Sequence, residues 1–255
     1  MMSQSEAVLQ SLPDEVRSTL RAYVSQVGRL FGASLEAVLL YGSAARGEFL
    51  PGRSNLNLMI VLTACEAHVL QSYATVHKHW QKEGIVVPLF FTPKELQQAA
   101  ASFPLEYLEI RDAYVLLQGQ DPFLVLQVDL QRLRAECEQE IRGNLLRLRQ
   151  RFVEGGGKPE SSALLMPLSL TALLPALRGM FRVLERKVPS SSELLLAELQ
   201  PALNVDSEVF EEVLRLKRGA ITPGPLELPR LFERYHAALQ ALIAKVAQYS
   251  SPRSS

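Results

Sequence analysis

Residues 35–63 constrain the fold more than any other part of this sequence. An apolar run at 37–41 ends at Gly42 and Ser43, and a second apolar run at 56–62 follows a short polar segment. Two apolar runs of this length, separated by turn-forming residues, are typical of two β-strands joined by a loop. The chain is therefore predicted to build a sheet around these two strands.

Strand-like and helix-like segments alternate around this pair. Residues 13–31 and 65–82 carry apolar side chains at helical spacing, which predicts two amphipathic helices. Runs rich in β-formers at 85–91 and 114–117 predict two more strands, and Thr92 with Glu95 has the spacing of a capping box that opens a short helix. A brief helix is expected after Pro104. Residues 1–122 are therefore predicted to form an α/β (α+β) domain with a small mixed sheet.

The composition changes after Pro122. Residues 123–250 are expected to form an all-α helical bundle, and a short tail, residues 251–255, is expected to be disordered. Helices are predicted in segments punctuated by glycine and proline: 125–152, 162–187, 191–199, 206–218 and 226–249.

Charge and cysteine usage narrow the class of protein. Lysine plus arginine equals aspartate plus glutamate at 27 each, so no overall field attracts nucleic acid or an anionic membrane, and neither is an expected partner. Cys65 and Cys137 have no metal or redox spacing and are expected in helices as reduced thiols. The N-terminus has no signal-peptide pattern, so a cytoplasmic location is predicted.

One segment has the length of a membrane span. Residues 161–177 carry no charged side chain. The length of this segment is near the lower limit for a helix that crosses a bilayer. Pro167 and Pro175 interrupt the segment, and several hydroxyl side chains make it semi-polar. A buried helix of the bundle is therefore predicted.

The loop between the first two strands has the chemistry of an anion site. Glycine allows a close approach of the backbone, and a serine hydroxyl donates to a phosphate oxygen; a helix beginning at such a turn adds free N–H groups. The candidate residues for binding phosphate or nucleotide are Gly42, Ser43, Arg46, Gly47, Arg53 and Ser54.

The whole pattern resembles a known motif. The order of residues is Gly-Ser, two residues, Arg-Gly, a spacer, and then Ser-Asn-x-Asn-Leu. This order is similar to the signature of the nucleotidyltransferase fold of the DNA polymerase beta superfamily, especially its bacterial kanamycin and minimal nucleotidyltransferase branch. The resemblance covers residues from about 13 to 123, and the helical second half fits by class. In that family the signature ends in Ser-Asp-x-Asp-Leu. Asn55 and Asn57 stand in place of the two aspartates.

The resemblance implies that the metal site is missing. In the family, two carboxylates at i and i+2 and a third on the next strand bind Mg²⁺, whereas Asn55 and Asn57 are neutral and residues 85–92 contain no acid. Mg²⁺ is a hard cation that prefers charged oxygen ligands. Glu48 and Asp112 lack an i, i+2 partner. We therefore expect no metal and no cofactor, and expect Arg46 and Arg53, without opposing carboxylates, to leave a positively charged pocket.

Three functions remain open. The first is a pseudoenzyme, inactive or strongly impaired, that keeps Asn55 and Asn57 at the former catalytic positions. It would bind a nucleoside triphosphate or another phosphate ligand, or a partner protein or second copy through the bundle. The second is an active transferase that moves a nucleoside monophosphate from a nucleoside triphosphate to a small-molecule or protein hydroxyl. Its Mg²⁺ would be held by other carboxylates or brought by the substrate or a partner chain. The third is an antitoxin-like interaction protein.

A weaker signal lies near the C-terminus. Arg230 and His236 have the spacing of the Arg-x(4–6)-His motif of HEPN ribonucleases, a resemblance of spacing only. Leu231 replaces the polar residue that usually follows the arginine. The match is therefore attributed to chance.

Overall fold

A computed structural model describes residues 4–123 and 128–250. The chain divides into two compact units, Met1–Val128 and Asp129–Ser255. The sequence predicted the boundary between the two domains at residue 122. The predicted disordered tail, residues 251–255, lies outside the described residues.

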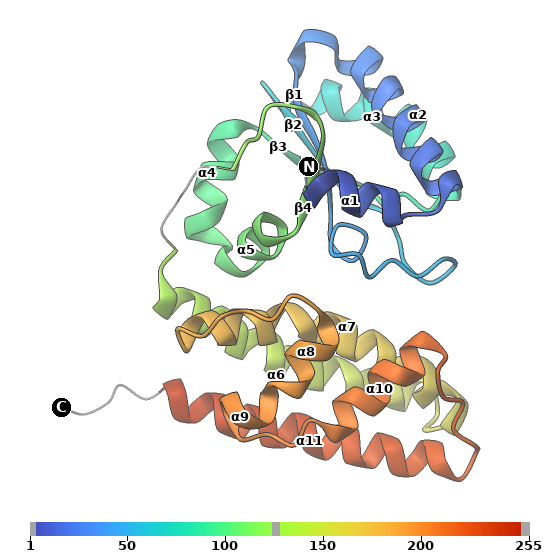
Figure 1. Cartoon of the computed structure of the whole chain (residues 1–255), viewed down its shortest axis with the longest axis vertical. Helices are drawn as coiled ribbons and strands as arrows, with labels where there is room; N and C mark the ends of the chain where they lie inside the picture. Colours follow the sequence, from blue (N-terminus) through green and yellow to red (C-terminus); the bar gives the residue numbers. More distant parts are fainter. Residues whose placement is uncertain (1–3, 124–127, 251–255) are drawn as a thin grey trace, which may run out of the picture. The chain divides into compact units, whose positions relative to one another are not determined.

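The first unit combines a four-stranded sheet with helices (Figure 1). The strand order is β3-β2-β1-β4; β1 pairs antiparallel with β2 and β4, and β2 pairs parallel with β3, so the sheet is mixed as predicted. The elements, in chain order, are α1 (Gln4–Ser11), α2 (Asp14–Phe31), a 3₁₀ turn (Gly32–Ser34), β1 (Leu35–Tyr41), β2 (Asn57–Leu62), α3 (Ala67–Lys82), β3 (Leu89–Phe91), α4 (Pro93–Ser102), α5 (Pro104–Asp112) and β4 (Tyr114–Gly119).

The two faces of the sheet have different cover. Because side chains alternate along a strand, Leu58 and Ile60 of β2 point to one face, where they join a core with Tyr23 of α2 and Trp80 of α3. Met59 points to the opposite face, toward α4 and α5. In Figure 1, α2 and α3 lie on one side of the strands, and α4 and α5 lie on the other.

Strand β3 is shorter than predicted. The sequence indicated a strand over residues 85–91, but only Leu89–Phe91 is regular, and Ile85 makes an isolated bridge to Leu56. Pro88 lies between these two parts. A proline has no backbone N–H to donate to a sheet, so the ladder is interrupted there. The capping box of Thr92 and Glu95 is confirmed, with the Glu95 N–H donating to the Thr92 hydroxyl at 3.2 Å.

The second unit is an all-α bundle, as predicted. A buried polar cluster joins three of its helices: Tyr235 donates to Ser169 at 3.0 Å, and the Asn144 amide donates to the Ser169 carbonyl at 2.8 Å. The elements are α6 (Leu130–Glu154), α7 (Pro159–Val183), α8 (Ser192–Ala197), α9 (Leu199–Leu203), α10 (Glu208–Arg218) and α11 (Glu227–Ser250).

Two local predictions for helices were wrong. The segment 191–199 was expected as one helix, but it ends at Ala197, and a separate helix begins at Leu199. Pro201 lies in this second helix and cannot donate the hydrogen bond that would make the two continuous. Cys65 lies in the loop before α3 rather than in a helix, and both Cys65 and Cys137 are free thiols.

Helix α7 contains the apolar segment. Residues Ser161–Val183 are long and apolar enough to cross a membrane by length and composition, and 56% of the most apolar window is buried inside the protein. The buried side chains include Met166, Leu170 and Leu177, and α7 packs against α6, α10 and α11. This helix forms part of the core of the bundle.

Candidate functional site

The loop after β1 is a hydrogen-bonded turn. Residues 42–47 form no α-helix; instead the Arg46 N–H donates to the Gly42 carbonyl at 3.0 Å, and the Glu48 N–H donates to the Ser43 carbonyl at 2.8 Å. Gly42 and Gly47 have φ angles of +78° and +74°, a region that L side chains rarely adopt. The chain can reverse this tightly because glycine stands at both positions.

Asn57 lies directly against Gly42. A β-carbon on Gly42 would be 2.7 Å from Nδ2 of Asn57, closer than real β-carbons approach another heavy atom. The strand register explains the contact, because Asn57 is paired with Tyr41, the residue before Gly42. The Asn57 amide therefore occupies the space beside the turn that a side chain at residue 42 would need.

The second asparagine lies just before β2. Asn55 is exposed, and its neighbour Leu56 is buried, with the Leu56 N–H donating to the Gly84 carbonyl at 2.9 Å. Leu56 and Leu58 both belong to the core with α2 and α3, so Asn57 between them points to the opposite face. The two positions at which the family signature has aspartates thus lie at the same end of β2.

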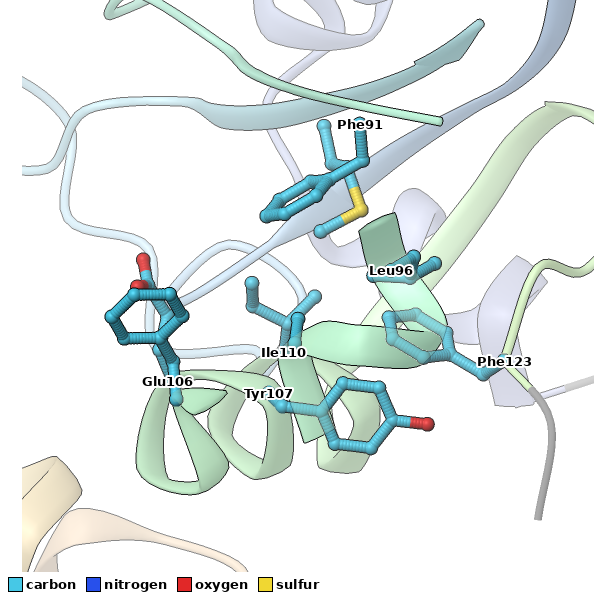
Figure 2. A pocket seen from close by; sticks show the side chains of 9 residues that line it. Phe91, Leu96, Glu106, Tyr107, Ile110 and Phe123 are labelled. Carbon is cyan, nitrogen blue, oxygen red and sulfur yellow. The ribbon is translucent and has the colours of Figure 1, made fainter. Parts of the chain in front are cut away.

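That face of the sheet is largely closed by apolar side chains. Met59 and Phe91 lie across from residues of α4 and α5 and enclose a cavity of about 20 Å³, room for about one water molecule. In the view of Figure 2, Phe91 lies above the helices, and Glu106 and Phe123 lie at opposite ends of the cavity. Strand β3 provides no carboxylate here.

Arg46 has an opposing carboxylate after all. Its guanidinium donates to Oε2 and to the backbone carbonyl of Glu109, both at 3.0 Å, and the exposed fractions of the two side chains are only 8% and 17%. The prediction of an unopposed positive charge at Arg46 is wrong. The sequence did not reveal the pair because its members are 63 residues apart. The ion pair ties the turn to α5.

Glu106 lies one helical turn before Glu109. Glu106 lines the cavity with Met59 and Phe91. Burial, with a smaller contribution from the Glu106 charge, raises the pKa of Tyr41 to about 12. Sequence reasoning considered Glu48 and Asp112 and missed both glutamates. Their i, i+3 spacing on a predicted helix was the available signal, because it puts two side chains on one helical face.

The remaining predicted residues lie along the same loop. The Ser54 hydroxyl accepts a hydrogen bond from the Leu50 N–H at 3.0 Å, so it stabilises the loop. Ser43 is half-buried, and Arg53 is exposed. The structure therefore brings together Gly42, Ser43, Arg46 and Asn57 at the turn and leaves Asn55 and Arg53 on the surface.

The residues present do not fit the usual pair of metal ions. Within residues 4–123 and 128–250, no group of three or more histidine, cysteine, aspartate or glutamate side chains is arranged to hold a metal. Asn55 and Asn57 supply only neutral amides, and Mg²⁺ binds charged oxygens far more strongly.

Comparison with known proteins identifies the fold. No protein-family model and no curated protein sequence matches the chain. Among solved structures, the chain is similar to the crystal structure of spectinomycin adenyltransferase AAD(9) from Enterococcus faecialis with ATP and spectinomycin, with a TM-score of 0.53. The match covers 88% of this chain and 99% of that chain at 10% identity. The chain has the nucleotidyltransferase fold. At this identity the similarity establishes the fold and leaves the activity open.

Proposed function

We propose that this nucleotidyltransferase-fold protein binds the phosphate groups of a nucleotide at the turn of residues 42–47 and has lost the metal-dependent transfer reaction. The observation that carries the proposal is the contact between Asn57 and Gly42, because it puts an amide where the family signature has a metal-binding carboxylate. The neighbouring adenyltransferase was crystallised with ATP, which supports a nucleotide as the ligand.

The amide group of Asn57 favours an anion over a cation at this place, although Glu109 neutralises Arg46. Asn57 turns its Nδ2 group toward the turn, and an amide N–H donates to a phosphate oxygen but repels a cation. Two unit charges about 4 Å apart near a protein surface interact by about 4 kcal/mol, so replacing two carboxylates removes most of the attraction for Mg²⁺. A phosphate gains from the same replacement.

A second candidate function has one observation in its favour. Glu106 provides a carboxylate on the sheet face to which Asn57 points, near Tyr41. An active transferase would use Glu106 to accept the proton of the attacking hydroxyl, and Mg²⁺ would arrive with the nucleoside triphosphate. The acceptor would be a small-molecule or protein hydroxyl.

Calorimetric titration of the full chain with ATP separates the two candidates. We expect ATP to bind with the same affinity in excess EDTA and in Mg²⁺, and we expect no release of pyrophosphate. Magnesium-dependent pyrophosphate release that the Glu106→Gln variant abolishes would establish the active transferase instead. If ATP does not bind under either condition, both candidates are wrong.

Restoring the two acids tests the site itself. The double variant Asn55→Asp, Asn57→Asp is expected to bind Mg²⁺ at least tenfold more tightly than the natural chain, because it recreates two carboxylates at i and i+2. The matched control is Gln97→Glu, Gln98→Glu, which adds the same charge on an exposed part of α4. Equal Mg²⁺ affinity of the two double variants would show that the turn no longer has the family geometry.

A further inference from the structure

The helical unit has a hollow of its own between α6 and α11. It measures about 310 Å³, at the lower end of the range for sites that hold small organic ligands. The residues around it come from the C-terminal part of α6 and the middle of α11: Arg149, Phe152, Val153, Phe232, Glu233 and His236.

One wall of the hollow consists of stacked aromatic rings. The rings of Phe152 and Phe232 stack with centroids 4.2 Å apart and an angle of 15° between their planes. His236 continues the wall, with its ring centroid 6.4 Å from that of Phe232 and an angle of 26°. Val153 adds an apolar side chain that is 76% exposed. Phe232 is already buried, so the apolar surface that a ligand ring would remove from water is that of the half-buried Phe152 and of Val153, and its removal favours binding.

The guanidinium of Arg149 lies beside these aromatic rings. Arg149 donates from Nε to Nε2 of His236 at 3.0 Å, so the imidazole is an acceptor and is neutral. Burial, together with the Arg149 charge, lowers the pKa of His236 and keeps it neutral. With Nε held in this way, the two terminal amino groups of Arg149 have the geometry for a bidentate bond to a carboxylate or phosphate.

Arg149 differs in its partner from Arg147 and Arg234. Arg147 pairs with Glu140 at 3.1 Å and Arg234 pairs with Glu212 at 2.8 Å, whereas no carboxylate in the described part of the chain lies within 4.0 Å of Arg149. Glu233 lines the hollow without pairing with it. The positive charge of Arg149 is therefore not neutralised by an acid of the described chain.

We propose that this hollow binds a small aromatic carboxylate, with its ring over Phe152 and Val153 and its carboxylate on Arg149. Glu233 also lines the hollow and repels a doubly charged phosphate more strongly than a singly charged carboxylate. This site does not depend on the proposed nucleotide site, because every residue in it belongs to the helical unit.

Nuclear magnetic resonance titration of the full chain tests the proposal with four probes. Benzoate is expected to shift the His236 ring and the backbone amides around Phe232. Benzyl alcohol supplies the ring without the charge, acetate supplies the charge without the ring, and phenyl phosphate supplies both with an additional charge. We expect benzoate to bind at least tenfold more tightly than each of the other three. Equal binding of benzoate and benzyl alcohol would overturn the proposal.

Three variants locate the interaction. Arg149→Gln should weaken benzoate at least tenfold, equivalent to about 1.4 kcal/mol. The matched control Arg151→Gln removes an exposed arginine of the same helix that does not line the hollow, and it should leave the affinity unchanged. Glu233→Gln should tighten benzoate by two- to fivefold, an estimate for removing one repulsive surface charge. Equal losses in Arg149→Gln and Arg151→Gln would exclude the proposed role of Arg149.

Discussion

The two faces of the sheet in the first unit are held by different forces. On the face toward α2 and α3, Leu58 and Ile60 are fully buried, and apolar contacts continue to Tyr23 and Trp80. The opposite face also buries Met59, but its end beside the turn is polar, and the ion pair of Arg46 with Glu109 ties the turn to α5 there.

The difference separates stability from binding within one sheet. The first face follows the alternating pattern of the strands, so it requires only apolar side chains of suitable size. At the turn, the second face requires particular residues, because a glycine, an amide and a buried ion pair each depend on the others' positions. Substitutions on the two faces should therefore have different signatures, and four experiments test this difference.

The largest effect is expected on the apolar face. Leu58→Ala should lower the free energy of unfolding by about 2–5 kcal/mol, because it leaves a cavity in a closely packed core. Chemical denaturation of the full chain measures this loss. At a concentration of ATP well above its dissociation constant, the folded fraction should still bind one equivalent. Loss of binding by a fully folded Leu58→Ala protein would contradict the separation of the two faces.

Breaking the ion pair should have the next largest effect. Arg46→Gln leaves the Glu109 carboxylate without its main partner in a mostly buried place and should cost about 3 kcal/mol. The control is Arg142→Gln, which breaks the more exposed pair with Glu138 on α6 and should cost less than about 1 kcal/mol. Denaturation curves in which both variants lose the same stability would show that Arg46 does not anchor the turn.

A methyl group at residue 42 tests the contact with Asn57. Gly42→Ala should cost about 2 kcal/mol, because alanine is strained at a φ of +78° and its β-carbon would meet the Asn57 amide. Gly52→Ala is the matched control: its φ is +72°, and apart from residue 52 and its two chain neighbours no described residue lies within 4 Å of the added carbon. We expect only Gly42→Ala to weaken ATP binding, as measured by calorimetry.

The smallest effect concerns a pKa. Glu106→Gln should lower the pKa of Tyr41 from about 12 while leaving it above 10.0, because burial is the larger cause of the shift. In this variant the folded state binds the proton of the Tyr41 hydroxyl less tightly than in the natural chain. In the natural chain, this residue contributes stability that is present below pH 10 and is lost as the pH rises toward 12. Tyrosinate absorbance against pH measures the change, and an unaltered curve would place Glu106 away from Tyr41.

The sequence predicted the elements that follow from regular patterns. The apolar periodicity of α2 and α3 and the capping box at Thr92 each depend on residues close together in the chain, and the structure agrees with them. It also predicted a turn between β1 and β2. Local patterns of this kind fix side-chain direction before any tertiary contact forms.

The rest of the site depends on contacts between distant residues. Arg46 meets Glu109 because α5 covers the sheet, and no local pattern connects these two positions. The pairing of β1 with β2 sets the distance from Asn57 to Gly42, and that pairing depends on the register of the whole sheet. By contrast, the interruption of β3 could have been predicted from Pro88. The β-forming residues around this proline led to the prediction of a continuous strand instead.

The contact between Gly42 and Asn57 restricts the order in which the two positions could change during evolution. While residue 57 carries an amide of this size beside the turn, residue 42 has no room for a side chain. A mutation at 42 is therefore harmful or tolerable according to what already occupies 57, which is epistasis between neighbouring strands. A smaller residue at 57 would have to appear first, so the glycine is preserved by its neighbour as well as by its own backbone angle.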